Sequence, residues 1–125
     1  MITIQSFIFI VVCHWIFDFI FQDERWALGK SKSIKALLKH TITYSLLWII
    51  PTTIFTGNFY GALIFSMITF VAHTVTDYFT SKIVSKKFAN KQLGGPIPNV
   101  GAFSWIGFDQ VLHYAQLGLT WLKLF

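Results

Sequence analysis

Charge is what this sequence has least of. Lys, Arg, Asp and Glu together make up 12% of its 125 residues, whereas soluble domains average about 25%. Hydrophobic residues make up 54% of the chain and aromatic residues 18%. The shortage of charge, with long uncharged stretches between the charged ones, predicts a membrane protein with a single domain over residues 1–125.

Cysteine and N-terminal basic residues are also scarce. The single cysteine, Cys13, excludes an intrachain disulfide and leaves the redox compartment open. No Lys or Arg precedes Arg25, and the first apolar run does not end in small residues. Because a signal peptide needs both features, we expect this run to be a retained membrane helix.

Four apolar stretches are long enough to cross a membrane, which takes about 20 residues. They cover residues 2–22, 34–55, 60–81 and 101–122. Pro51 predicts a kink or stop near the far end of the second stretch. The predicted fold is therefore all-α, a four-helix transmembrane bundle.

The three connections differ in character. Trp26 and Leu28 suit a short amphipathic segment that lies at the membrane interface between the first two spans. Residues 56–61 hold no charge and predict a tight turn between the second and third spans. Residues 93–100 contain two glycines and two prolines, Gly94, Gly95, Pro96 and Pro98, and predict an irregular linker.

Nine of the ten basic residues fall in the first and third connections. They are Arg25, Lys30, Lys32, Lys35 and Lys39, then Lys82, Lys86, Lys87 and Lys91. Since Lys and Arg mark the cytoplasmic side of membrane proteins, both termini are predicted to be non-cytoplasmic. This distribution explains the net charge of +5 without a nucleic-acid partner.

Histidine and aspartate recur at a spacing of four within the predicted spans. His14 precedes Asp18, His73 precedes Asp77, and Asp109 precedes His113. Residues four apart share one face of a helix. The fourth span runs opposite to the first and third and has the reverse order of residues. The three aspartates are therefore expected in one layer nearer the cytoplasm, with these histidines roughly 6 Å deeper. His40 is expected near the carboxylates.

Buried carboxylates need a positive partner, because each costs about 2.5–3.5 kcal/mol at the bilayer centre. We expect no Lys or Arg at the same depth, which leaves protons or bound cations to neutralise the three aspartates. Imidazole and carboxylate together suit first-row divalent metals. The predicted metal ligands, for one or two ions, are His14, Asp18, His40, His73, Asp77, Asp109 and His113. Zinc is the first choice, with manganese, iron or nickel as alternatives.

Other interpretations of the same residues remain open. The pairs could form a structural hydrogen-bonded network or a path for protons or ions. Gln22 and Gln110 are expected to support the ligands or contact other helices rather than bind metal. The lysines of the two basic connections are explained by the orientation of the protein in the membrane and by contact with anionic lipid headgroups. A more specific hypothesis is that an anionic substrate is attracted by Lys30, Lys32, Lys39 and Lys82.

The ordered motifs also resemble one family. They are H-x3-D-F-x2-Q at 14–22, K-S-x2-A-L-L-x-H at 32–40, H-x3-D-Y at 73–78 and D-Q-x2-H at 109–113. The family comprises small bacterial and phage membrane proteins of unknown function. It is in turn similar to membrane-bound, metal-dependent hydrolases of bacterial inner membranes. The resemblance implies a bacterial inner-membrane protein whose shared polar core is formed by the seven predicted ligands.

These observations favour a metal-dependent hydrolase that acts on an anionic ester or phosphoester, either a lipid or a small molecule, at the cytoplasmic leaflet. A water activated by the ion would attack the ester, and Asp18, Asp77 or His40 would serve as catalytic groups. Two other classes of protein are rivals. One is a transporter or channel for protons or divalent cations, and the other is a structural or regulatory membrane protein. A haem-carrying bundle gains nothing from an aspartate beside each histidine.

Overall fold

The computed structural model describes residues 1–95 and 100–125, and this part is mostly helical, without a strand. Helix α1 (Ile4–Trp15) continues into the π-helical turn η1 (Ile16–Ile20) and is followed by the short α2 (Glu24–Gly29). The longer elements are α3 (Ile34–Leu47), α4 (Ile49–Thr56), α5 (Phe59–Ala89) and α6 (Ala102–Leu124). The predicted all-α class is confirmed.

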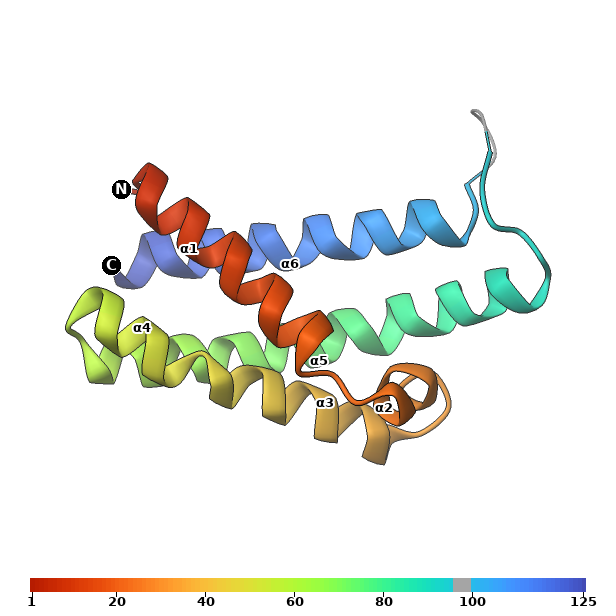
Figure 1. Cartoon of the computed structure of the whole chain (residues 1–125), viewed down its shortest axis with the longest axis horizontal. Helices are drawn as coiled ribbons and strands as arrows, with labels where there is room; N and C mark the ends of the chain where they lie inside the picture. Colours follow the sequence, from red (N-terminus) through yellow and green to blue (C-terminus); the bar gives the residue numbers. More distant parts are fainter. Residues whose placement is uncertain (96–99) are drawn as a thin grey trace.

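The helices pack around α5, the longest of them. Figure 1 shows α5 and α6 side by side, with α3 and α4 along the other side of α5 and α1 crossing α6. Both termini and the turn between α4 and α5 lie at one end of the molecule. Helix α2 and the C-terminal end of α5, which both carry basic residues, lie at the other end, as the distribution of these residues predicts.

The predicted kink in the second apolar stretch is present, one turn before the proline. Helix α3 ends at Leu47 and α4 begins at Ile49, so the break is at Trp48, three residues before Pro51. A proline ring clashes with the carbonyl group four residues earlier, which is that of Leu47. The break therefore lies where the steric effect of Pro51 acts.

The predicted connections differ in outcome. The tight turn consists of Gly57, with a positive φ of 69°, and Asn58, whose side chain accepts a hydrogen bond from Gly61 N. A short helix, α2, is present between the first two apolar stretches, and its position at a membrane interface stays a prediction. Pro96 and Pro98, in the predicted linker, lie outside the described residues.

The four predicted spans are not equally supported. Within the described residues, α5 alone is both long and apolar enough to cross a membrane. It extends to Ala89, beyond the predicted end at residue 81. The first stretch forms a shorter apolar helix over Ile4–Ile20, and the second is divided at Trp48.

Polar residues dominate the interior. Among the described residues, the buried set contains nine hydrophobic side chains and sixteen polar or charged ones, while 33 large hydrophobic side chains are exposed. Six of the nine buried hydrophobic side chains form one cluster, Ile10, Tyr44, Trp48, Phe65, Leu117 and Trp121. This distribution is the reverse of the usual pattern in a water-soluble globule.

Candidate metal centre

All four histidines and three of the five acidic residues come together in one buried cluster. His14 and Asp18 come from α1 and η1, His40 from α3, His73 and Asp77 from α5, and Asp109 and His113 from α6. The histidines are at most 1% exposed and the aspartates at most 8%. The predicted meeting of the three His/Asp pairs is confirmed, and His40 does lie beside the carboxylates.

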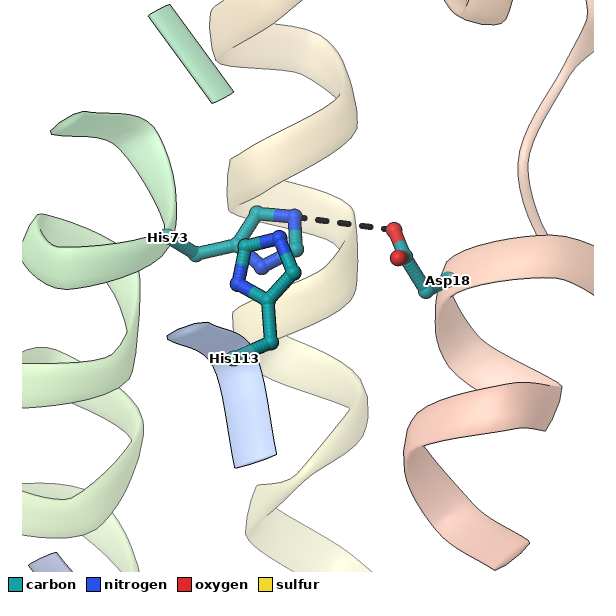
Figure 2. A group of neighbouring side chains, drawn as sticks. All are labelled: Asp18, His73 and His113. Carbon is teal, nitrogen blue, oxygen red and sulfur yellow. Dashed lines mark ion pairs between the residues drawn. The ribbon is translucent and has the colours of Figure 1, made fainter. Parts of the chain in front are cut away.

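Four atoms converge in the first group. His40 Nε2 lies 3.0 Å from Asp18 Oδ1 and 3.3 Å from Asp77 Oδ2. His73 Nε2 lies 3.6 Å and 3.5 Å from the same two oxygens, and the two imidazole nitrogens are 3.0 Å apart. Figure 2 shows the overlapping rings of His73 and His113, with a dashed line from a His73 nitrogen to Asp18.

These separations fit a metal ion. Bonds of about 2.0–2.1 Å in tetrahedral geometry place ligand atoms about 3.3–3.4 Å apart, and the five distances above range from 3.0 to 3.6 Å. Asp18 Oδ1 is buried and makes no well-aligned hydrogen bond, although His40 Nε2 lies 3.0 Å away. The buried His/Asp groups could therefore hold a metal ion.

A second group shares Asp77. His113 Nε2 lies 3.1 Å from Asp77 Oδ1 and 3.3 Å from Asp109 Oδ2. Asp77 thus presents Oδ2 to the first group and Oδ1 to the second. Thr80 Oγ1 donates a hydrogen bond to the other oxygen of Asp109, Oδ1. This bond restrains the orientation of the carboxylate.

Stacking holds the central imidazole in place. The ring of His73 lies between Tyr44, at a centroid distance of 4.0 Å, and His113, at 4.1 Å. Both stacks are close to parallel, with interplanar angles of 18° and 22°. His73 therefore has little freedom to turn its Nε2 away from the carboxylates.

His14 is part of the cluster but belongs to none of the groups that could hold a metal. Gln110 Nε2 donates to Asp109 Oδ2, so Gln110 Oε1 faces His14 Nε2, 2.8 Å away. An amide oxygen only accepts hydrogen bonds, so Nε2 of His14 carries the proton. Nδ1 then accepts from the Tyr44 hydroxyl at 2.7 Å. Both ring nitrogens are occupied, which favours a supporting role for His14.

The expectation that no basic side chain reaches the carboxylates is wrong. Lys30 Nζ lies 2.8 Å from Asp77 Oδ2. Burial alone would lower the pKa of Lys30, but the carboxylates of Asp77 and Asp18 raise it, so the amine is an ammonium ion. The predicted depth of each residue along the spans did not reveal this contact. Lys30 lies outside the predicted spans, directly after α2, and α2 folds back over the cluster.

The other three predicted substrate lysines do not reach the cluster. Lys32, Lys39 and Lys82 are exposed, and the amine of Lys82 lies 3.5 Å from the centroid of the Tyr78 ring. The two glutamines do lie beside the centre. Gln110 bridges His14 and Asp109, and Gln22 lines a cavity together with Asp18.

Sequence reasoning missed three polar groups. Tyr44, Thr80 and Ser81 all lie on the faces of α3 and α5 that point to the cluster. Their positions held a clue, because Tyr44 follows His40 by four residues and Ser81 follows Asp77 by four. Extending each helical face by one turn would have found both.

Residues 6–125 match a family described as protein of unknown function (DUF3307). Comparisons with curated proteins and with solved structures gave no match.

Proposed function

The chain belongs to the DUF3307 family, and we propose from the geometry of its site that it is a membrane-embedded, metal-dependent hydrolase. The proposed substrate is an anionic ester or phosphoester at the cytoplasmic leaflet. One observation supports this most strongly. The side chains of His40, His73 and Asp77, and those of Asp77, Asp109 and His113, each bring three ligand atoms within 4.8 Å of one another in a buried site.

Two ions, with zinc as the first choice, account for both groups of side chains. His40, His73 and Asp77 would supply three ligands to one ion, and Asp18 Oδ1, 3.0 Å from His40 Nε2, lies next to them. Asp77, Asp109 and His113 supply three, which leaves the open position typical of a catalytic site. Asp77 would bridge the two. Ions held there lower the pKa of water and polarise a phosphoryl oxygen.

The protein side chains have separable roles in this proposal. Asp18 lines the cavity beside the centre and is placed to accept a proton from the attacking water. Thr80 and Gln110 keep the Asp109 carboxylate oriented, and supporting bonds of this kind tune metal sites. His14 and Tyr44 continue this support on the far side of Gln110.

A membrane location is supported by the distribution of polarity. Exposed apolar side chains cover the outer faces of the helices, as Ile54 at 79% and Met67 at 70% exposure illustrate. Extensive exposed apolar surface is typical of contact with a membrane or with a protein partner. We propose that α1 with η1, α3 with α4, α5 and α6 each cross the inner membrane of a bacterium, with both termini non-cytoplasmic.

An ion or proton pathway is the second candidate, and one observation favours it. Gln116 donates hydrogen bonds to Thr69 at 3.2 Å and to Thr120 at 3.1 Å, which extends polar contacts from the cluster along α5 and α6. The apolar core argues against a continuous path. Trp48, Phe65 and Leu117 are fully buried in this part of the bundle.

Hydrolysis of chromogenic esters tests the proposal. Zinc-loaded protein should hydrolyse bis(4-nitrophenyl) phosphate, lose this activity with EDTA and regain it with zinc. His113→Gln should abolish it, whereas Asp23→Asn, in the exposed pair with Arg25, should not. Zinc-loaded protein that cleaves neither this diester nor 4-nitrophenyl phosphate nor 4-nitrophenyl acetate would contradict the proposal. Zinc or proton flux in proteoliposomes would then favour the second candidate.

A further inference from the structure

Two adjoining cavities lead from the metal centre to the gap between α2 and α5. The inner cavity, of about 200 Å³, is lined by Asp18, Lys30 and Asp109 among others. The outer cavity, of about 360 Å³, lies between α2 and α5, where Leu28 and Phe88 line it. Four residues line both cavities, Ala27, Lys30, Ser81 and Val84. A ligand could therefore extend from the centre to the surface of the helix pair.

The inner cavity contains polar atoms that lack partners. Ser81 is 9% exposed, and its Oγ makes no hydrogen bond. Gln22 Oε1 is also buried and unpaired. Most buried polar groups have hydrogen-bond partners, so two unpaired groups in one cavity indicate a polar ligand. The Ser81 hydroxyl can donate to an oxygen of such a ligand, whereas Gln22 Oε1 accepts only, as from a protonated P–OH group.

The positive charge of Lys30 favours an anionic ligand. Without metal, Lys30 is paired with Asp77. Metal ions bound by Asp18, Asp77 and Asp109 would supply the positive charge that Asp77 otherwise takes from Lys30. The ammonium group, which lines both cavities, would then be free to pair with an anionic group of the ligand.

The surface of the outer cavity is mostly apolar. Leu28, Val84 and Phe88 line it, together with Ser31 and Ser85. An alkyl chain gains about 0.8 kcal/mol for each CH₂ group that it buries. The two cavities in series thus match a molecule with a polar head and an apolar chain.

We infer that the substrate is an anionic amphiphile whose phosphate-type head lies in the inner cavity, beside Lys30 and Ser81, and whose chain leaves between α2 and α5. This inference rests on the proposed hydrolase function, since the head would lie at the metal centre. It adds the class of substrate, the place of entry and a role for Ser81.

Binding of dodecylphosphonate tests the inference, because its P–C bond resists hydrolysis. Calorimetry with zinc-loaded protein in phosphatidylcholine nanodiscs should give saturable binding of one molecule per chain. Methylphosphonate, which has the head alone, should bind at least about 100-fold more weakly, since the buried chain is missing. Phosphatidic acid in the nanodisc should compete if the natural ligand is a membrane lipid. Lack of competition would indicate a free single-chain amphiphile.

Two variants locate the site. Ser81→Ala should weaken binding of dodecylphosphonate roughly tenfold, as expected for the loss of a hydrogen bond to a charged group. Val84→Trp should obstruct the junction of the cavities and abolish binding, whereas Val75→Trp, at a 54% exposed position on the same helix, should not. Zinc content should be unchanged in all three variants.

The results separate the two proposals. Equal affinity for the two phosphonates, or full binding by both Ser81→Ala and Val84→Trp, would overturn the inference. Hydrolysis of bis(4-nitrophenyl) phosphate under those conditions would leave the hydrolase function standing. Saturable binding without hydrolysis of any ester would support the amphiphile site and contradict the hydrolase.

Discussion

Asp77 presents its two oxygens to different neighbours. Oδ2 faces Lys30, His40 and His73, and Oδ1 faces His113. At 1% exposure, this carboxylate depends on these groups in place of water. Lys30 and a metal ion would compete for the same oxygen.

The competition at Asp77 predicts opposite effects of Lys30→Met with and without zinc. The metal-free variant should be less stable by about 2–3 kcal/mol, because a buried carboxylate loses its charged donor. The same variant should bind zinc more tightly, since no ammonium group has to be displaced. Thermal unfolding with and without zinc measures both effects, and weaker zinc binding by the variant would contradict the competition.

The hydrogen bonds of His14 predict that it supports the centre without binding metal. His14→Gln should retain the zinc stoichiometry and lose about 10- to 100-fold in affinity, the usual effect of changing an outer hydrogen-bond partner. His73→Gln, the matched change in the first ligand group, should lose zinc. A His14→Gln protein without zinc would instead make His14 a ligand, as the sequence predicts.

At the residue scale, the sequence predicted the members of the cluster and missed the partners of some of them. The His/Asp spacing identified six residues, and His40 followed from its depth in the second apolar stretch. The contact between Lys30 and Asp77 could not be predicted, because the two residues are 47 positions apart in the sequence and no pattern connects them. The same holds for the bond between His14 and Gln110, which depends on how α1 packs on α6.

Among the elements, η1 and the break at Trp48 position the site. The Phe21 amide donates to the Ile16 carbonyl at 3.0 Å, five residues earlier, which is the hydrogen bond of a π-helical turn. Such turns are frequent at functional sites, and this one contains Asp18. No residue pattern in the sequence predicts it, whereas Pro51 did predict the break in the second apolar stretch.

Two glycines allow a matched test of the helical boundaries. Gly57 has a φ of +69° at the end of α4, whereas Gly107 lies inside α6 with open space around it. Gly57→Ala should destabilise the protein by about 1 kcal/mol, because a side chain disfavours the left-handed conformation. Gly107→Ala should stabilise it by up to about 1 kcal/mol through helix propensity. Thermal unfolding followed by circular dichroism gives both shifts, and shifts of the same sign would contradict the assigned boundaries.

For the molecule as a whole, the reversed order of Asp109 and His113 was the informative feature. With the fourth apolar stretch antiparallel to the third, as four successive spans require, this order predicted that His113 lies at the level of His73, and the structure agrees (Figure 1). The sequence could not predict which helices are neighbours. That choice depends on side-chain packing, such as the edge-on contacts of Trp48 with Phe17 and Phe65.

The proposed topology predicts which ends of the molecule face the cytoplasm. In a Cys13→Ser background, Lys32→Cys and Lys87→Cys should react with an impermeant maleimide only after the cells are opened. Tyr60→Cys, at a 79% exposed position beside the α4–α5 turn, should react in intact spheroplasts. The reverse pattern would contradict the orientation, and reaction of all three sites in intact spheroplasts would contradict the membrane-spanning arrangement.

The central claim is that a metal ion holds this buried cluster together, and elemental analysis of the purified protein tests it most directly. Protein prepared without chelators should contain one or two equivalents of a transition metal per chain. Asp77→Ala should lose them, because Asp77 contributes an oxygen to both groups, and Asp23→Ala should retain them. A folded native protein with no stoichiometric metal, even after incubation with zinc, would contradict the account.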